Sequence, residues 1–218
     1  MHIPDGFISP KVYIPAYIVS SGLWIYSLKK IKKVLSSETL PALSALTSFS
    51  FILMMITVPL PGGTTAHCLG IGPLSVLFGP IISFLCITLV LLIQALFFGN
   101  GGITTLPINS IAIGFFGSLL IYFLYKLFGK FRKAGVFISS FFGVLTSAFL
   151  LAIILGIQPL ISHDSNGKPL FFPFGLKVTI PAMLIPHIFV GIAEGILTII
   201  TLEVVKKFDK EKYFASKY

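Results

Sequence analysis

Long apolar runs, separated by short groups of Pro, Gly and basic residues, dominate this sequence. About 20 apolar residues in a helix span the bilayer hydrocarbon, and irregular backbone cannot face lipid. The run 67–78 is too short to span, so we expect irregular backbone around Gly70, Gly72 and Pro73, with His67 in a non-helical segment buried among helices. The pattern predicts an all-α integral membrane protein, a bundle of about seven transmembrane helices. The predicted helices cover residues 12–28, 40–58, 67–78, 80–98, 106–128, 136–157 and 178–205.

Composition agrees with a protein whose main solvent is lipid. Apolar residues make up 56% of the 218 positions and charged residues 11%, whereas soluble domains carry about 25% charged residues. The alternating polarity of membrane-barrel strands is absent, and we expect no cleavable signal peptide, since no basic region precedes the first apolar run. Cys68 and Cys86 form no C-x-x-C pattern, so neither a disulfide framework nor a zinc cluster is indicated. We expect residues 1–218 to form a single membrane domain, with a chelating segment at 1–11, helices within 12–205 and a basic tail at 206–218.

The net charge of +9 follows the predicted topology. Thirteen of the 16 Lys and Arg follow the first, fifth and seventh predicted helices, which all end on the same side of a membrane. The positive-inside rule makes this side cytoplasmic, so we expect the N-terminus and the 158–177 loop outside and the C-terminus inside. Binding to nucleic acid is disfavoured, because the clusters flank apolar runs and form no single face. The thirteen are Lys29, Lys30, Lys32, Lys33, Lys126, Lys130, Arg132, Lys133, Lys206, Lys207, Lys210, Lys212 and Lys217.

His2 carries the chemistry most specific to a metal. A terminal NH2-X-His sequence can bind a metal through its amine, the deprotonated amide nitrogen of residue 2 and the His Nδ1, which leaves one equatorial position open. This in-plane nitrogen set suits square-planar Ni(II) or Cu(II) and disfavours tetrahedral zinc. The chelate needs a free amine on Met1, and we expect Met1 to persist because aminopeptidase removes Met only before small residues.

His67 is the best candidate for the fourth ligand, because it lies in the Gly-rich segment PGGTTAHCLG on the same outer side. Taken singly, His2 is more often an accident of sequence, and His67 is more often a core histidine bonded to a carbonyl. Together they indicate a function, because ionisable residues at membrane depth are by default functional and the topology lets these two meet.

Four segments resemble one known family: MHIPDGF, VPLPGGTTAHCLG at 58–70, LIQALFFGNGGITTL at 92–106 and IPHIFVGIAEGILT at 185–198. They resemble the NikM and CbiM group, the substrate-binding S components of energy-coupling factor transporters for nickel and cobalt. The resemblance implies Met1, His2 and His67 as ligands of Ni(II) or Co(II), bound as transported substrate with no organic cofactor. It also implies a multi-pass protein of a prokaryotic cell (inner) membrane, with a transmembrane T component, a cytoplasmic ATPase pair and often a small accessory membrane subunit as partners. The chain has no Walker A sequence, so we expect ATP hydrolysis by the partners and no enzyme activity here.

Three polar residues are candidates for support of the site. Gln94 and Asn109 either orient a ligand or join helices, while Asp5 has a turn signature that would fold the N-terminus back toward His67. The family pattern carries a second Asn and a Met where Ala112 and Ile113 stand here, which leaves metal preference in doubt. Other candidates are weaker: subunit contact or structure is favoured for His187 and Glu194, and a solvated loop for His163 and Asp164.

Two other functions stay open. A membrane-embedded metal-dependent enzyme would need H-E-x-x-H, a nucleophile with its base, or a carboxylate pair, and Glu194 and Glu203 are the acids within the predicted helices. A stand-alone metal channel would favour repeated polar rings over one tight chelate. The sequence does not settle nickel against cobalt, although MHIPDG with PGGTTAH favours nickel.

Overall fold

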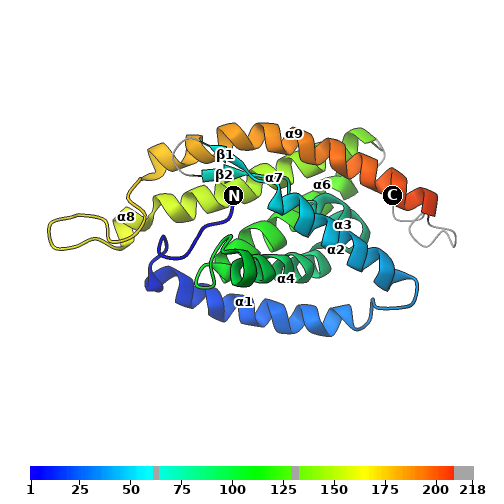
Figure 1. The fold of residues 1–218 in the computed structure, drawn as a ribbon, viewed down its shortest axis with the longest axis horizontal. Helices are drawn as coiled ribbons and strands as arrows, with labels where there is room; N and C mark the ends of the chain where they lie inside the picture. Colours follow the sequence, from blue (N-terminus) through cyan, green and yellow to red (C-terminus); the bar gives the residue numbers. More distant parts are fainter. Residues whose placement is uncertain (61–63, 129–132, 209–218) are drawn as a thin grey trace.

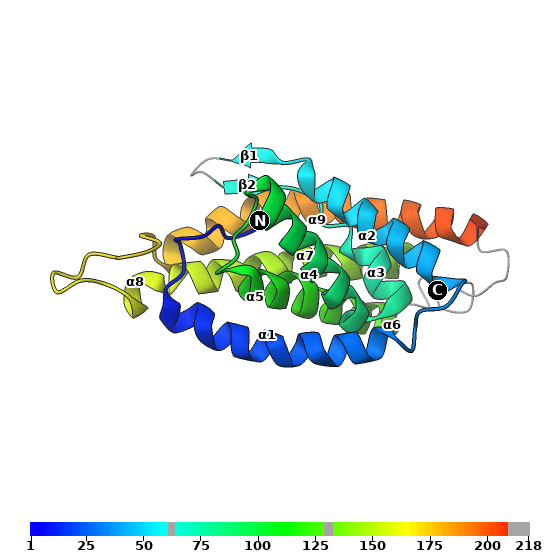
Figure 2. The ribbon, with the colours of Figure 1, turned by 60° about the horizontal axis from the view of Figure 1, so that its bottom comes forward.

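The computed structural model describes residues 1–60, 64–128 and 133–208, which fold into an elongated bundle of helices (Figure 1). The N-terminus lies at the centre of the bundle, beside a short antiparallel hairpin (Figures 1 and 2). Helices α5, η1 and α6 follow one another without a break, and η1 is a π-helix. The elements are α1 Pro10–Ile31, α2 Thr39–Met55, β1 Val58–Leu60, β2 Thr64–Ala66, α3 Ile71–Phe78, α4 Pro80–Phe98, α5 Leu106–Asn109, η1 Ser110–Gly117, α6 Ser118–Phe128, α7 Lys133–Gly156, α8 Gln158–Ile161 and α9 Leu176–Phe208.

Four helical segments are long and apolar enough to cross a membrane: Pro80–Phe98, Leu106–Phe128, Lys133–Ile161 and Leu176–Phe208. Helix α2 is apolar but has 17 residues, and α1 has 22 residues with lysines near both ends. Many large apolar side chains point outward, among them Ile18, Phe97 and Phe189, each more than 70% exposed. A surface of this kind is suited to lipid. The structure therefore supports a multi-pass membrane protein with a helical fold.

The short third run behaves as expected. Helix α3 begins only at Ile71 and has 8 residues, so His67 lies in non-helical backbone between β2 and α3. Gly70 sits in this segment with a φ of 64°, a left-handed conformation that favours glycine. A Cβ there would also come within 2.9 Å of the Ser50 Cα on α2. The glycine thus lets the segment pass directly against α2.

Several expected boundaries were wrong. The second helix was expected to reach residue 58, but α2 ends at Met55 and Val58 pairs with Ala66 in the hairpin. The helix ends early because Pro59 cannot donate a helical hydrogen bond and disfavours a helical backbone at Val58. The 158–177 loop begins with α8, and the last helix extends from Leu176 to Phe208. Parts of some expected features lie outside the described residues, namely Pro61, Gly62 and Gly63 of the glycine-rich segment and Lys130, Arg132, Lys210, Lys212 and Lys217 of the basic clusters.

Helices α7 and α9 pack closely through glycines. A Cβ at Gly191 of α9 would come within 2.9 Å of the Phe141 ring, and one at Gly195 within 2.6 Å of the Phe137 ring. Small residues let membrane helices approach each other in this way. The contact fixes the rotation of α9, so that His187 and Glu194 on the same helix are buried, with 0% and 1% of their surface exposed.

Candidate metal centre

The first nine residues form a non-helical segment with a turn at Asp5 and Gly6, which enters the bundle and is held there by Asn109. The Asn109 amide makes a pair of hydrogen bonds with one residue: it accepts from the Ile3 N–H at 3.0 Å and donates to the Ile3 carbonyl at 3.0 Å. The Thr105 hydroxyl also donates to that carbonyl at 2.6 Å. Met1, Ile3 and Ile8 are buried. The segment therefore has a defined position, with its first residues inside the protein.

Asp5 fastens the same segment to the loop that precedes α5. Its carboxylate accepts hydrogen bonds from the backbone N–H groups of Ile103 at 3.0 Å and Thr104 at 2.8 Å, and from the Thr104 hydroxyl. Burial raises the pKa of Asp5, but these hydrogen bonds outweigh burial and leave the pKa below its usual value. A Cβ at Gly102 would come within 2.5 Å of the Asp5 backbone nitrogen. Only glycine allows the loop and the N-terminal segment to lie this close.

This arrangement brings the Met1 amine to His67. The amine nitrogen lies 3.3 Å from His67 Nε2 and donates to the Thr65 carbonyl at 2.7 Å. On the far side of the imidazole, His67 Nδ1 lies 3.1 Å from the Cys68 carbonyl, which can only accept, so Nδ1 carries the proton. The Nε2 lone pair of His67 therefore faces the amine of Met1. Both residues are 3% exposed.

His2 completes the group of nitrogen atoms. Its ring centroid lies 4.5 Å from that of His67, with the planes tilted by 49°. His2 Nδ1 is 3.3 Å from the Asn100 side-chain oxygen, while His2 Nε2 is buried without a partner among the described residues. Asn100 was not singled out from the sequence, so its contact with His2 is a feature that sequence reasoning missed.

Burial makes this group electrically neutral near neutral pH. It lowers the pKa of the Met1 amine from 8.0 to about 5. Burial, together with the nearby N-terminal charge, lowers the pKa of His2 to about 3. Neutral amines and imidazoles present lone pairs and not protons to a cation. Among the described residues no cluster of three or more His, Cys, Asp or Glu side chains could hold a metal, so the chemistry of this centre depends on the amine and backbone of the N-terminus.

Glu194 positions the segment that carries His67, which is the structural alternative expected for it, although the sequence did not reveal its partners. Its carboxylate accepts hydrogen bonds from the backbone N–H groups of Leu69 at 2.8 Å, Gly70 at 3.1 Å and Gly72 at 3.4 Å. These residues lie two to five positions after His67 in the sequence. The N–H groups at the start of a helix lack intrahelical partners, and here a carboxylate from α9 satisfies those at the start of α3. His67 is thus held from one side by α9.

The family comparison agrees with these features. The model of the family CbiM, described as the cobalt uptake substrate-specific transmembrane region, matches residues 2–212. The chain belongs to this family. A fused nickel transport protein NikMN from Rhodobacter capsulatus is 39% identical over 91% of this chain and 59% of its own length. A probable fused nickel transport protein LarMN from Lactiplantibacillus plantarum is 38% identical over 95% of this chain and 65% of its own length.

Solved structures support the same fold. A truncated transition metal transporter is 36% identical to this chain and superposes with a TM-score of 0.90, over 95% of this chain and 99% of that one. A second transition metal transporter is 37% identical, also with a TM-score of 0.90. The chain spans about three fifths of the length of the two fused relatives. This CbiM-family protein therefore corresponds to one part of those longer chains.

The other predicted site residues of this CbiM-family protein have different surroundings. Gln94 donates to the Phe51 carbonyl at 3.4 Å and so joins α4 to α2, the helix-joining alternative. His163 lies in an exposed loop, with Nδ1 3.1 Å from the Asp164 carbonyl. His187 Nδ1 lies 2.6 Å from the Met183 carbonyl one turn earlier in α9, so His187 has a structural contact. Ala112 and Ile113, where the family pattern has Asn and Met, are buried in η1.

Proposed function

We propose that this protein captures Ni(II), or Co(II), in a square plane of four nitrogens and presents it for ATP-driven import. The ligands are the Met1 amine, the deprotonated amide nitrogen and Nδ1 of His2, and Nε2 of His67. The observation that carries the proposal is the 3.3 Å separation of the Met1 amine from His67 Nε2 in a buried site. The contrasting functions, a membrane enzyme or a channel, lack such an observation, and the named relatives are transport proteins.

The distances suit this coordination with small movements. In the chelate the His2 amide lies opposite His67, so the Met1 amine and His67 Nε2 are neighbours in the plane. Neighbouring nitrogens about 2 Å from a metal are about 2.9 Å apart, close to the observed 3.3 Å. His2 Nδ1 must leave the Asn100 oxygen to bind the metal. Among the described residues the His2 backbone N–H has no hydrogen-bond partner, so its deprotonation breaks no contact there.

The donor set favours nickel among the candidate metals. Four nitrogens in a plane, one of them an amide anion, suit a square-planar metal, while hard cations such as Mg²⁺ and Ca²⁺ prefer oxygen. The metal brings two positive charges and the deprotonated amide offsets one. The two fused relatives are named for nickel transport and the family description names cobalt uptake, so the donor geometry alone carries the preference for nickel.

Membrane arrangement and partners belong to the same proposal. Seven membrane segments place the N-terminus and metal site outside and the C-terminus in the cytoplasm of a prokaryotic cell. A T component, an ATPase pair and a small accessory membrane subunit would complete the transporter. A membrane-impermeant thiol reagent applied from outside should label Asn166→Cys in the loop after α8 but not Ala134→Cys at the start of α7, in a background without Cys68 and Cys86. The reverse labelling would overturn this topology.

The decisive test adds one glycine before Met1. The extension converts the Met1 amine to an amide and creates NH2-X-X-His, which fills a square plane with four of its own nitrogens and excludes His67. A protein with one glycine added at the C-terminus is the matched control, and intact mass must confirm both termini. X-ray absorption should show loss of the His67 imidazole from the nickel shell, and reconstituted uptake should fall strongly. If the N-terminally extended protein keeps a His67-ligated nickel and normal uptake, the chelate is wrong.

A further inference from the structure

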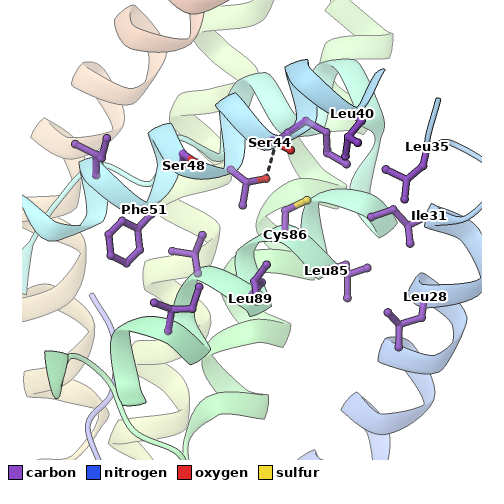
Figure 3. A pocket seen from close by; sticks show the side chains of 15 residues that line it. Leu28, Ile31, Leu35, Leu40, Ser44, Ser48, Phe51, Leu85, Cys86 and Leu89 are labelled. Atoms are coloured by element: carbon purple, nitrogen blue, oxygen red, sulfur yellow. Dashed lines mark hydrogen bonds between the residues drawn. The ribbon is translucent and has the colours of Figure 1, made fainter. Parts of the chain in front are cut away.

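An apolar groove runs between α1 and α2 on the surface of the bundle. Its floor is α4, where Cys86 and Leu89 lie between the side chains of Ile31 on α1 and Ser48 on α2 (Figure 3). The groove has a volume of about 750 Å³, and its lining is almost entirely aliphatic and aromatic, apart from the hydroxyls of α2 and the Cys86 thiol. It contains none of the residues of the metal centre. An apolar hollow of this size on a membrane protein is a site for a hydrocarbon chain or a helix.

The length of the groove decides between these two occupants. Along α2 it extends from Leu40 to Ile52, and along α4 from Leu85 to Ile93. A rise of 1.5 Å per residue makes these stretches about 18 Å and about 12 Å long. One leaflet contributes about half of the roughly 30 Å of hydrocarbon, or about 15 Å. The groove therefore matches a single acyl chain in one leaflet and is too short for a helix that crosses the membrane.

One end of the groove is strongly basic. Leu28, Ile31 and Leu35 line that end, and the lysines Lys29, Lys30, Lys32 and Lys33 are interleaved with them in the sequence and are all exposed. The connection from α1 to α2 contains one acid, Glu38. Clusters of basic residues beside membrane helices attract anionic lipid headgroups. The charge lies where the headgroup of a lipid with its chain in the groove would be.

We propose that the groove binds an anionic phospholipid, with one acyl chain between α1 and α2 and its phosphate at Lys29 and Lys32. The lipid fills the hollow that separates α1 from α2 and thereby fixes α1 against the bundle. The side-chain contacts of α1 with helices include Trp24 Nε1 to the Thr88 hydroxyl of α4 at 3.3 Å, Ser20 to the Pro107 carbonyl of α5 and Lys11 to the Ile161 carbonyl of α8. The site is independent of metal and of the proposed transport function.

The test uses native mass spectrometry of the purified protein in detergent, with phosphatidylglycerol or phosphatidylcholine of identical chains added as probe. Ser48→Phe fills the groove, and Ala45→Phe is its control, because Ala45 is exposed on α2 but does not line the groove. Lys29→Gln with Lys32→Gln removes the charge. Lys206→Gln with Lys207→Gln removes equal charge from the end of α9, far from the groove in the sequence. Monodispersity and an unchanged unfolding temperature show that each variant is folded.

We expect the protein to retain one phosphatidylglycerol tightly, and better than phosphatidylcholine. Ser48→Phe should abolish retention and Ala45→Phe should not. Loss of Lys29 and Lys32 should weaken retention of phosphatidylglycerol by about 25-fold, since each lysine near an anionic headgroup contributes about fivefold, while the α9 pair should have little effect. Equal retention of both lipids, no response to Ser48→Phe, or protection of a Ser48→Cys thiol only when a partner subunit is present would each overturn the proposal. The last result would assign the groove to a protein.

Discussion

Replacement of Glu194 with Gln tests how the His67 segment is held. The carboxylate accepts three backbone hydrogen bonds, from Leu69, Gly70 and Gly72. Gln keeps one acceptor oxygen, loses the charge and turns an NH2 group toward an N–H donor. Hydrogen bonds to a charged group contribute about 1.5–3 kcal/mol and neutral ones about 0.5–1.5 kcal/mol. Two weakened bonds and one lost bond therefore reduce the hydrogen-bond free energy by about 3.5–6 kcal/mol before relief of desolvation is counted.

Metal affinity is the appropriate readout for this variant. Loss of the buried charge also relieves its desolvation, so global stability can change in either direction. Groups that orient metal ligands typically affect affinity by 10–100-fold, and a nickel titration of Glu194→Gln should show a loss in this range. Glu203→Gln on the same helix is the control, because Glu203 makes an exposed ion pair with Lys133 at 3.9 Å, worth about 0–1 kcal/mol. If Glu194→Gln binds nickel as tightly as Glu203→Gln, the carboxylate does not position His67.

Three further measurements address the centre itself. His67→Ala should abolish tight nickel binding with the fold intact, whereas His163→Ala should leave the titration unchanged; a monodisperse His67→Ala protein with full affinity would contradict the assignment. Asn109→Leu leaves the Ile3 N–H without its partner at a cost of about 1–3 kcal/mol, so nickel affinity should fall about tenfold, and an unchanged titration would show that the N-terminal segment holds its position without this amide. Burial lowers the pKa of the Met1 amine to about 5, so between pH 6 and 8 nickel displaces only the proton of the His2 amide. Nickel affinity should therefore rise about tenfold per pH unit in this range. Below pH 5 the amine is protonated, and affinity should fall further. An exposed amine of pKa 8.0 would give a slope near two, and calorimetry in buffers of different ionisation enthalpy distinguishes the two cases.

The sequence revealed the parts of the fold and site that depend on local pattern. Apolar runs predicted the helices, because a helix that crosses a membrane requires about 20 consecutive apolar residues. The shortness of the third run placed His67 in irregular backbone, and the order Met1, His2 suggested a chelate from bond connectivity alone. These inferences depend only on residues close together in the sequence, so they can be made without a tertiary structure.

The interactions that assemble the site lie beyond such reasoning. Glu194 is 125 residues from Leu69, and Asn100 is 98 residues from His2, so nothing in the local pattern pairs them. The hairpin was missed because each strand has three residues, too few for an alternating pattern. A signal for Glu194 did exist, since an acid in an apolar helix is by default a functional candidate. Its partners, the N–H groups of Leu69, Gly70 and Gly72, could not be inferred from the local pattern.

The two halves of the proposed metal site are anchored to different parts of the bundle. Ile3 and Asp5 fasten the N-terminal segment to Asn109 and the loop before α5, whereas Glu194 of α9 holds the residues after His67. The Met1 amine also donates to the Thr65 carbonyl beside His67. The N-terminal half contributes three ligands and chelates on its own, while His67 contributes one. If the proposed ligands are right, a displacement of α9 relative to α5 would strain the bond from His67 before the three bonds of the N-terminal chelate. The metal would then stay on Met1 and His2 with one position open for the next ligand.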